Sequence, residues 1–284
     1  MTRDEVRAVA GKLRNLHSRY ASCFKRKEAQ KHSLVYLRGL FLGEGRKNVE
    51  RIALRFATAG DGSPAGQNEV VALQEFLTVS PWEAGDVMRE IQATFAEQFV
   101  PSTSQWPIGT VGVFDETSFL KSGPESCGVK RQYCGRLGQT ANCQVGVFLV
   151  GVTPAGTALL DHQLYLPKEW IRDKKQRRNT RVPKEIRFRT KPQIAIDQWK
   201  RTLAVGQVRF DWIVADALYG HDHKFLEALE QLDQRYLVQV SVDTRLWPKQ
   251  YTGQLRPWLG DRLPSQQHTQ KGCSRASAMI YAAF

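Results

Sequence analysis

The sequence predicts a mixed α/β fold in which an all-helical N-terminal domain precedes a core that contains a sheet. Over the first hundred residues, apolar side chains recur at three- and four-residue spacing, which is the period of amphipathic helices. From residue 108 onward, short β-branched runs alternate with helical patterns in the order strand, hairpin, helix, strand, helix, strand. We expect a helical domain over 1–107, a core over 108–242, and an incomplete insertion region or tail over 243–284.

The N-terminal helices are expected where apolar stripes and end signals agree. A glycine-, serine- and proline-rich stretch, GDGSPAG, separates two of them. Ser80, Pro81 and Glu83 form a start signal, with a serine N-cap, proline at the first helical position and glutamate at the third. The expected helices cover 5–26, 34–43, 48–57 and 69–77, with a further one from Ser80.

The core begins after a proline-bounded linker, 101–107. Short apolar, β-branched runs predict buried strands, and a Pro/Gly turn, TPAG, predicts a hairpin between two of them. The expected strands are 108–114, 142–152, 157–166, 210–216 and 235–242, the expected helices are 191–204 and 221–232, and 167–191 is expected to be a basic loop. After residue 243 no periodic pattern continues, so the last twenty residues are interpreted as a tail.

Charge indicates the class of partner. The chain carries 41 Lys+Arg against 28 Asp+Glu, a net charge of +13. The segment 172–191 alone holds ten basic and two acidic residues, hence +8. A local patch of this kind favours a nucleic acid, because neutralising phosphates releases counterions. A solvated basic loop is the alternative.

Other compositional features exclude several classes. No run approaches eighteen apolar residues, so a membrane span is not expected, and charges throughout the first twenty residues argue against a secretion signal. Five cysteines without any CxxC spacing favour reduced thiols over a zinc site or a disulfide framework. These features predict a cytoplasmic protein.

Two aspartates stand where apolar runs end, Asp115 after IGTVGVF and Asp216 after FDWIVA. If the two strands are neighbours, the carboxylates meet at one sheet edge, and a divalent cation removes their repulsion. Hard oxygen ligands favour Mg²⁺ or Mn²⁺, and such sites carry out phosphoryl transfer by the two-metal scheme. For each aspartate alone, a turn or a helix N-cap is the competing interpretation.

Longer sequence motifs around these aspartates resemble those of a known family. The stretch DETSFLKSGPESCGVKRQYCGRLGQTANCQVGVFLV at 115–150 resembles the opening of the catalytic core in DDE-type transposases of the insertion sequence 701 family. YLPKEW, RFRTKP and WIVADALYG match later signatures in the same order, and YLRGLFLGEGRKNVERIA at 36–53 resembles the leading region. The resemblance covers roughly residues 30–245.

This resemblance implies an RNase H-like core in which Asp115 and Asp216 are the first two acids of a catalytic triad that binds Mg²⁺ or Mn²⁺. It also implies that the helical N-terminal domain recognises terminal inverted repeats. Glu116, the next residue of the strand, is expected on the opposite side from Asp115. Cys143 is expected to pack in the core. Four residues of the matched stretch are candidates to assist the metal site, with ordinary turn or strand positions as the alternative: Lys121, Arg131, Tyr133 and Gln144.

The sequence departs from the family at the third acid. Family members carry a glutamate on a helix after the last strand, whereas no glutamate follows Glu230 here. The sequence therefore predicts a chain that is truncated, frameshifted or completed by a second reading frame, and it leaves open whether this chain is an active enzyme.

Basic residues of the matched region are expected to hold DNA phosphates near the metal site without reading sequence. Trp170 and Phe188 flank them and either stack on an unpaired base or pack, packing being the favoured role. The candidate DNA-binding residues are Lys121, Arg131, Lys168, Arg172, Lys174, Lys175, Arg177, Arg178, Arg181, Arg187, Arg189 and Lys191.

The leading hypothesis is a bacterial DNA transposase that cleaves and transfers strands at transposon inverted repeats. It implies double-stranded DNA, both terminal repeats and target, as partner, a homodimer in a synaptic complex, association with the nucleoid and no membrane. The alternative is a non-catalytic DNA-binding remnant or a repressor of transposition. A third hypothesis is a cellular RNase H-like nuclease.

Overall fold

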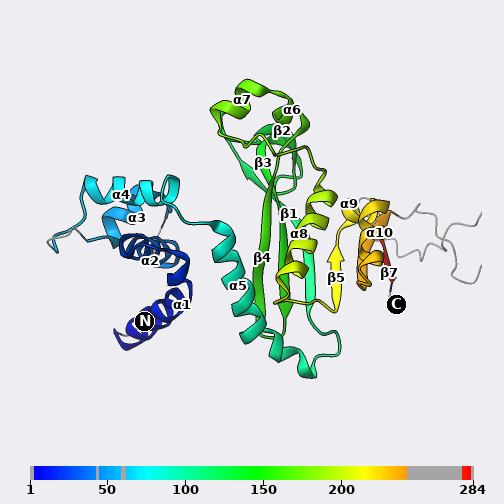
Figure 1. Ribbon diagram of the computed structural model, residues 1–284, viewed down its shortest axis with the longest axis horizontal. Helices are drawn as coiled ribbons and strands as arrows, with labels where there is room; N and C mark the ends of the chain where they lie inside the picture. The colour runs from blue at the N-terminus through cyan, green and yellow to red at the C-terminus, as the bar shows by residue number, and fades with distance from the viewer. Residues whose placement is uncertain (1–2, 43–44, 59–61, 242–276, 283–284) are drawn as a thin grey trace, which may run out of the picture. The chain divides into compact units, whose positions relative to one another are not determined.

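The computed structural model describes residues 3–42, 45–58, 62–241 and 277–282 (Figure 1). The chain forms two compact units, Met1–Glu90 and Ile91–Phe284. No helix in the described ranges is both long and apolar enough to cross a membrane.

The N-terminal unit is built from helices around an aromatic centre. Phe24, Phe76 and Trp82 contact one another with ring centroids 5.7 Å apart in each pair. The indole Nε1 of Trp82 also donates a hydrogen bond to the carbonyl oxygen of Phe76 at 2.9 Å. The elements of this unit are α1 (Arg3–Tyr20), the 3₁₀ turn η1 (Ala21–Cys23), α2 (Lys27–Leu42), α3 (Val49–Phe56), α4 (Gln67–Thr78) and the start of α5 (Ala84–Gln98).

Three expected details of these helices are wrong. The first helix ends at Tyr20 and not near residue 26, because η1 turns the chain so that Phe24 enters the aromatic centre. The second helix begins at Lys27 and not at residue 34, and Phe41, although it fits the apolar period of the expected helix 34–43, is 65% exposed. The helix expected from Ser80 begins at Ala84, since Trp82 is held in the aromatic centre.

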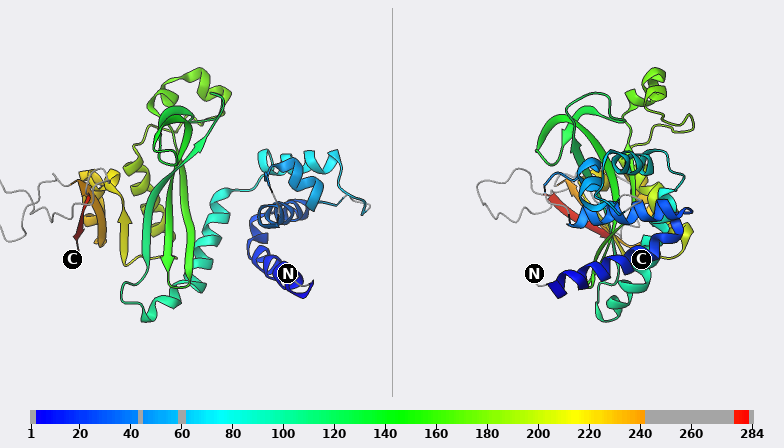
Figure 2. Two further views of the ribbon diagram at one scale, coloured as in Figure 1. Left: turned by 180° about the vertical axis from the view of Figure 1, so that it is seen from behind. Right: turned by 90° about the vertical axis from the view of Figure 1, so that its left-hand side faces the viewer.

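A seven-stranded mixed sheet organises the second unit. Its order is β2-β3-β1-β5-β6-β7, with β4 also paired to β3. Strand β1 pairs antiparallel with β3 and parallel with β5, β5 pairs parallel with β6, and β7 pairs antiparallel with β6. Figure 2 shows the long strands side by side from behind. The strands are β1 (Val111–Leu120), β2 (Lys130–Cys134), β3 (Gln139–Thr153), β4 (Gly156–Tyr165), β5 (Trp212–Ala215), β6 (Tyr236–Ser241) and β7 (Ser277–Ala282).

Helix α8 (Lys191–Val205) packs on this sheet. It begins with a capping box in which Thr190 and Gln193 satisfy each other's backbone N–H groups, and it ends at Gly206 in the left-handed region at φ 74°. Trp199 is buried against the strands, and Gln198 Nε2 donates to the carbonyl oxygen of Val147 at 2.9 Å. The remaining helices are the 3₁₀ helix η2 (Val100–Gln105), α6 (Lys168–Arg172), α7 (Lys174–Asn179), α9 (Ala217–Gly220) and α10 (His223–Gln231).

The structure confirms the expected hairpin, helix α8 and the strands β5 and β6, and it differs elsewhere. Strand β1 continues to Leu120, because its whole length pairs with β3. The expected loop 167–191 contains α6 and α7, since Asp173 accepts from the backbone N–H of Gln176 and starts the second helix. The expected helix 221–232 is found as α10, which begins after its cap Asp222, and a further short helix, α9, precedes it. Residues 277–282, assigned to a tail, form β7.

Gly220, the last residue of α9, has no room for a side chain. A Cβ there would lie 2.0 Å from the backbone oxygen of Gln239 on β6. We expect Gly220→Ala to lower the free energy of unfolding by about 2–4 kcal/mol, because a backbone atom cannot move aside cheaply. Chemical denaturation checks this, with Gly123→Ala as the control, since a Cβ at Gly123 meets nothing within 4 Å. Equal midpoints for the two variants would contradict the prediction.

Candidate metal centre

The parallel pairing of β1 and β5 sets the positions of the two predicted aspartates. In the ladder, Val113 is opposite Val214 and Phe114 is opposite Ala215. Asp115 follows Phe114 within β1, and Asp216 follows the last residue of β5, so both come directly after the last pair of the parallel ladder. The expectation that β1 ends at Asp115 is wrong, but the parallel pairing does end there.

Each aspartate is held by a nearby backbone N–H. Asp216 is the N-cap of α9, and its Oδ1 accepts from Leu218 N at 2.9 Å. Asp115 Oδ1 accepts from the N–H of Glu116 at 2.7 Å. Both side chains are exposed. These bonds orient the two carboxylates.

A third carboxylate belongs to this cluster. One oxygen each of Asp115, Glu116 and Asp216 lie within 4.8 Å of one another. The expectation that Glu116 stands apart on the opposite side of the strand is therefore wrong. Burial raises the pKa of Glu116, the ion pair with Lys191 lowers it, and the charges of Asp216 and Asp115 raise it again.

Lys191 is the cation that faces the cluster. Its Nζ lies 2.6 Å from Glu116 Oε1, and both side chains are largely shielded, at 25% and 14% exposure. Lys191 is the first residue of α8, where the capping box fixes the helix, and its Nζ also lies 5.9 Å from the centre of the Tyr165 ring. Among the described residues, the cluster thus brings three carboxyl groups together beside one lysine.

Tyr219 closes the cluster from below the surface. The side chain is fully buried. Burial raises the pKa of Tyr219, and the charges of Glu116, Asp216 and Asp115, together with a hydrogen bond to Glu116, raise it further. The Tyr219 hydroxyl therefore lies at the buried side of the three carboxylates.

The donor set fits a divalent cation. All three candidate ligands offer carboxylate oxygens, which Mg²⁺ and Mn²⁺ prefer. Asp115 and Asp216 are exposed, so a phosphate oxygen and water have access to the remaining coordination positions.

Comparison with known proteins decides the family. The family model described as DDE superfamily endonuclease matches residues 19–279. The chain belongs to this family. Its mixed sheet is thus an RNase H-like core, and DDE endonucleases use divalent metals at clusters of acidic residues, in agreement with the carboxylates assembled here.

A curated relative agrees with this assignment. The protein named "Probable transposase for insertion sequence element IS701" of Microchaete diplosiphon is 30% identical over 194 residues. The matched region covers 67% of this chain and 46% of the relative, so the DDE endonuclease chain spans about half of that relative's length.

The predicted DNA-binding residues fall into two groups. Most residues on and next to α6 and α7 are exposed, beside β2 at one end of the long strands in Figure 1. Arg177 instead donates hydrogen bonds to the carbonyl oxygens of Ile171, Pro183 and Ile186, which makes it a structural residue. The exposed group contains Arg131, Lys168, Arg172, Lys174, Lys175, Arg178, Arg181, Arg187 and Arg189, whereas Lys121, Arg177 and Lys191 are half-buried.

The other residues singled out in the sequence take part mainly in packing and hydrogen bonding within the fold. Trp170 is buried and donates to the carbonyl oxygen of Val129 at 2.7 Å, so its predicted packing role is confirmed. Phe188 packs edge-on against Tyr165. Gln144 Nε2 donates to the carbonyl oxygen of Cys127 at 2.5 Å, and Cys143 is a buried free thiol, as expected. Tyr133 is 65% exposed.

Sequence reasoning missed Glu116 as a member of the cluster, the role of Tyr219, and the pairing of Lys191. The motif DET did contain a signal for Glu116. Two successive acidic residues on a strand beside a metal site can both reach that site. The Lys191–Glu116 contact joins residues 75 positions apart and had no sequence signal.

Removing the lysine partner of Glu116 is expected to destabilise the fold in a pH-dependent way. In Lys191→Met, measured without metal, Glu116 keeps its burial and its acidic neighbours but loses its counter-ion, so its pKa rises further. A carboxyl with a raised folded-state pKa stabilises the fold only while protonated, and this stability is lost as pH rises through that pKa. Urea unfolding should show a loss of about 1–3 kcal/mol at pH 8 and a smaller one at pH 5.

The control is Lys130→Met, which removes a solvent-exposed pair with Glu169, 43% and 65% exposed. Such a solvent-screened pair contributes little to stability. Equal losses in the two variants, or a Lys191→Met loss that does not depend on pH, would contradict the prediction.

Proposed function

We propose that this chain carries the metal-dependent DNA-cleaving core of an insertion-sequence transposase, with Asp115 and Asp216 as metal ligands. The strongest support is that the two aspartates directly follow the last paired residues of neighbouring parallel strands. Membership of the DDE endonucleases and the similarity to an insertion-sequence transposase agree with it.

The residues of the chain have separate tasks in this proposal. Asp115 and Asp216 hold Mg²⁺ or Mn²⁺, which when bound activates an attacking hydroxyl and stabilises the leaving oxygen of a phosphodiester. Glu116 supplies the third carboxylate. Lys191 balances Glu116 when no cation is bound, and the hydroxyl of Tyr219 lies at the buried side of the cluster.

DNA is the partner, in the form of terminal inverted repeats and of target duplex. The exposed cations of α6 and α7 neutralise backbone phosphates, which positions the duplex without reading its sequence. A homodimer in a synaptic complex and association with the nucleoid complete the proposal. The helical domain over 1–107 is the part that engages the repeats.

The test is metal-dependent cleavage by the full chain. Supercoiled plasmid carrying candidate inverted repeats is incubated with the protein in Mg²⁺, in Mn²⁺ and in EDTA. Nicking with either cation, and its loss in EDTA, is the expected result. Salt-sensitive binding without nicking under any divalent cation would instead identify a DNA-binding repressor, and preferential cleavage of RNA–DNA hybrids would identify an RNase H-like nuclease.

A further inference from the structure

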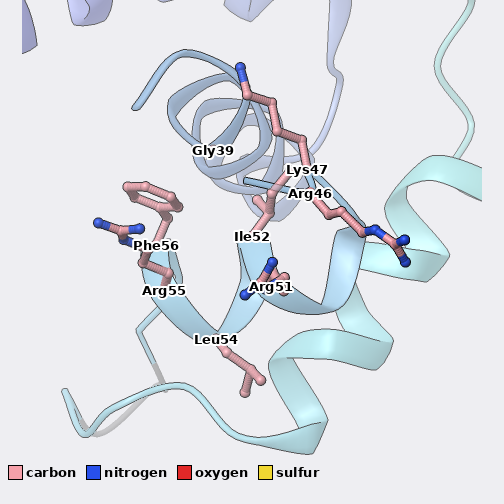
Figure 3. Close-up of a pocket in the computed structure, with 8 residues that line it drawn as sticks. All are labelled: Gly39, Arg46, Lys47, Arg51, Ile52, Leu54, Arg55 and Phe56. Carbon is pink, nitrogen blue, oxygen red and sulfur yellow. The ribbon is translucent and has the colours of Figure 1, made fainter. Parts of the chain in front are cut away.

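The N-terminal unit has a pocket of its own, between the end of α2 and helix α3. Its volume is about 430 Å³, and it is lined by Gly39, Arg46, Lys47, Arg51, Ile52, Leu54, Arg55 and Phe56. Figure 3 shows Arg55 and Phe56 together on one side and Arg46 on the opposite side. All eight residues come from one short stretch, 39–56, within a single compact unit.

The charged residues around the pocket are mostly basic. Residues 45–56 contain four basic residues and one acidic residue, Glu50, which gives +3. The four cationic side chains are all exposed. Within the described part of the chain, neither Arg46 nor Arg51 forms an ion pair with a carboxylate. These arginines are therefore available to an external anion.

The pocket floor is rigid and apolar. A Cβ at Gly39 would lie 2.3 Å from Ile52, so glycine lets α2 and α3 approach until Ile52 is buried, at 2% exposure. Asn48 caps α3 by accepting from Arg51 N at 2.8 Å, which fixes the start of the helix. Lys47 Nζ donates to the carbonyl oxygen of Leu40 and ties the connecting segment to α2. The arginines thus stand on a preformed support.

The spacing of the arginines suits a chain of phosphates. Arg51 and Arg55 are four residues apart, so they lie on one face of α3 and roughly 6 Å apart along its axis. The guanidinium of Arg55 lies 5.7 Å from the centre of the Phe56 ring, which limits its freedom. Several separate guanidinium groups fit a repeating polyanion better than one compact anion, and the apolar floor accepts a sugar face.

We propose that this pocket binds the sugar–phosphate backbone of duplex DNA, as a contact point separate from the metal centre and from the α6–α7 segment. The proposal rests on the proposed function, since it gives the DNA substrate a specific site on the N-terminal unit. Arg46, Arg51 and Arg55 contact phosphates, and the half-buried ring of Phe56 contacts deoxyribose.

The experiment measures binding of the full chain to a fluorescent duplex in EDTA over a series of salt concentrations. The triple variant Arg46→Gln, Arg51→Gln, Arg55→Gln should lower the slope of log affinity against log salt by about 3, near 0.9 for each phosphate that is no longer neutralised. The matched control removes three exposed charges elsewhere in the same unit, Lys12→Gln, Arg14→Gln, Lys25→Gln. The control should change the slope by less than about 1.

Two controls separate a loss of DNA binding from a loss of folding. A lysine version of the triple variant retains the charges and should keep most of the slope, and thermal melts show whether each variant is folded. A folded glutamine variant that binds like the matched control would overturn the proposal. Because no metal is present, loss of nicking bears on the proposed function and leaves the binding comparison unaffected.

Discussion

Asp216→Asn is expected to abolish metal-dependent nicking and to leave both the fold and DNA binding intact. Asparagine keeps an oxygen that accepts from Leu218 N, so the cap of α9 is preserved. The substitution removes only the negative charge that binds the cation. We expect the nicking rate to fall by at least about 10²–10³-fold, the cost of removing one preorganised electrostatic interaction from a reaction site.

Asp222→Asn is the matched control for this experiment. Asp222 also caps a short helix, accepting from Phe225 N at 3.0 Å, and it does not belong to the carboxylate cluster. Its substitution should leave nicking unchanged. Asp115→Asn should behave like Asp216→Asn. If the double variant, Asp115→Asn with Asp216→Asn, nicked plasmid at the wild-type rate, the metal-centre assignment would be lost.

The sequence was sufficient for features determined by neighbouring residues. The apolar runs before Asp115 and Asp216 predicted strands, and the structure confirms that these strands are parallel neighbours. The spacing of apolar residues within 191–204 predicted α8, and the structure confirms it. The same reasoning located the hairpin of β3 and β4 at its Pro/Gly turn.

Features that depend on partners distant in sequence were not predictable in this way. Strand β1 runs past Asp115 only because β3 pairs along its full length, and Glu116 therefore remains in a position to join the cluster. Phe41 fits the apolar period of its helix but is exposed, because the packed face of α2 is determined by α3 and α4. The arginines that line the α2–α3 pocket were missed, since their net charge is modest beside the +8 of 172–191.

Neutralising the α6–α7 segment is expected to cause a large loss of DNA affinity. The variant carries Arg172→Gln, Lys174→Gln, Lys175→Gln and Arg178→Gln, four exposed positions. If each cation holds one phosphate, the slope of log affinity against log salt falls by about 3–4. Affinity at moderate salt should fall on the order of 10²–10³-fold. Fluorescence anisotropy with a duplex in EDTA measures both quantities, and a wild-type slope would contradict the prediction.

Arg177→Gln provides the internal contrast, because Arg177 holds the segment together through carbonyl oxygens and is half-buried. Its loss should increase protease cleavage within 171–186 and change the salt slope by about 1 or less. The α6–α7 segment and the α2–α3 pocket belong to different compact units, so their variants should have additive effects on the free energy of binding. Non-additive losses would mean that the two surfaces share phosphates of one short site, whereas additive losses would mean that each engages its own stretch of duplex.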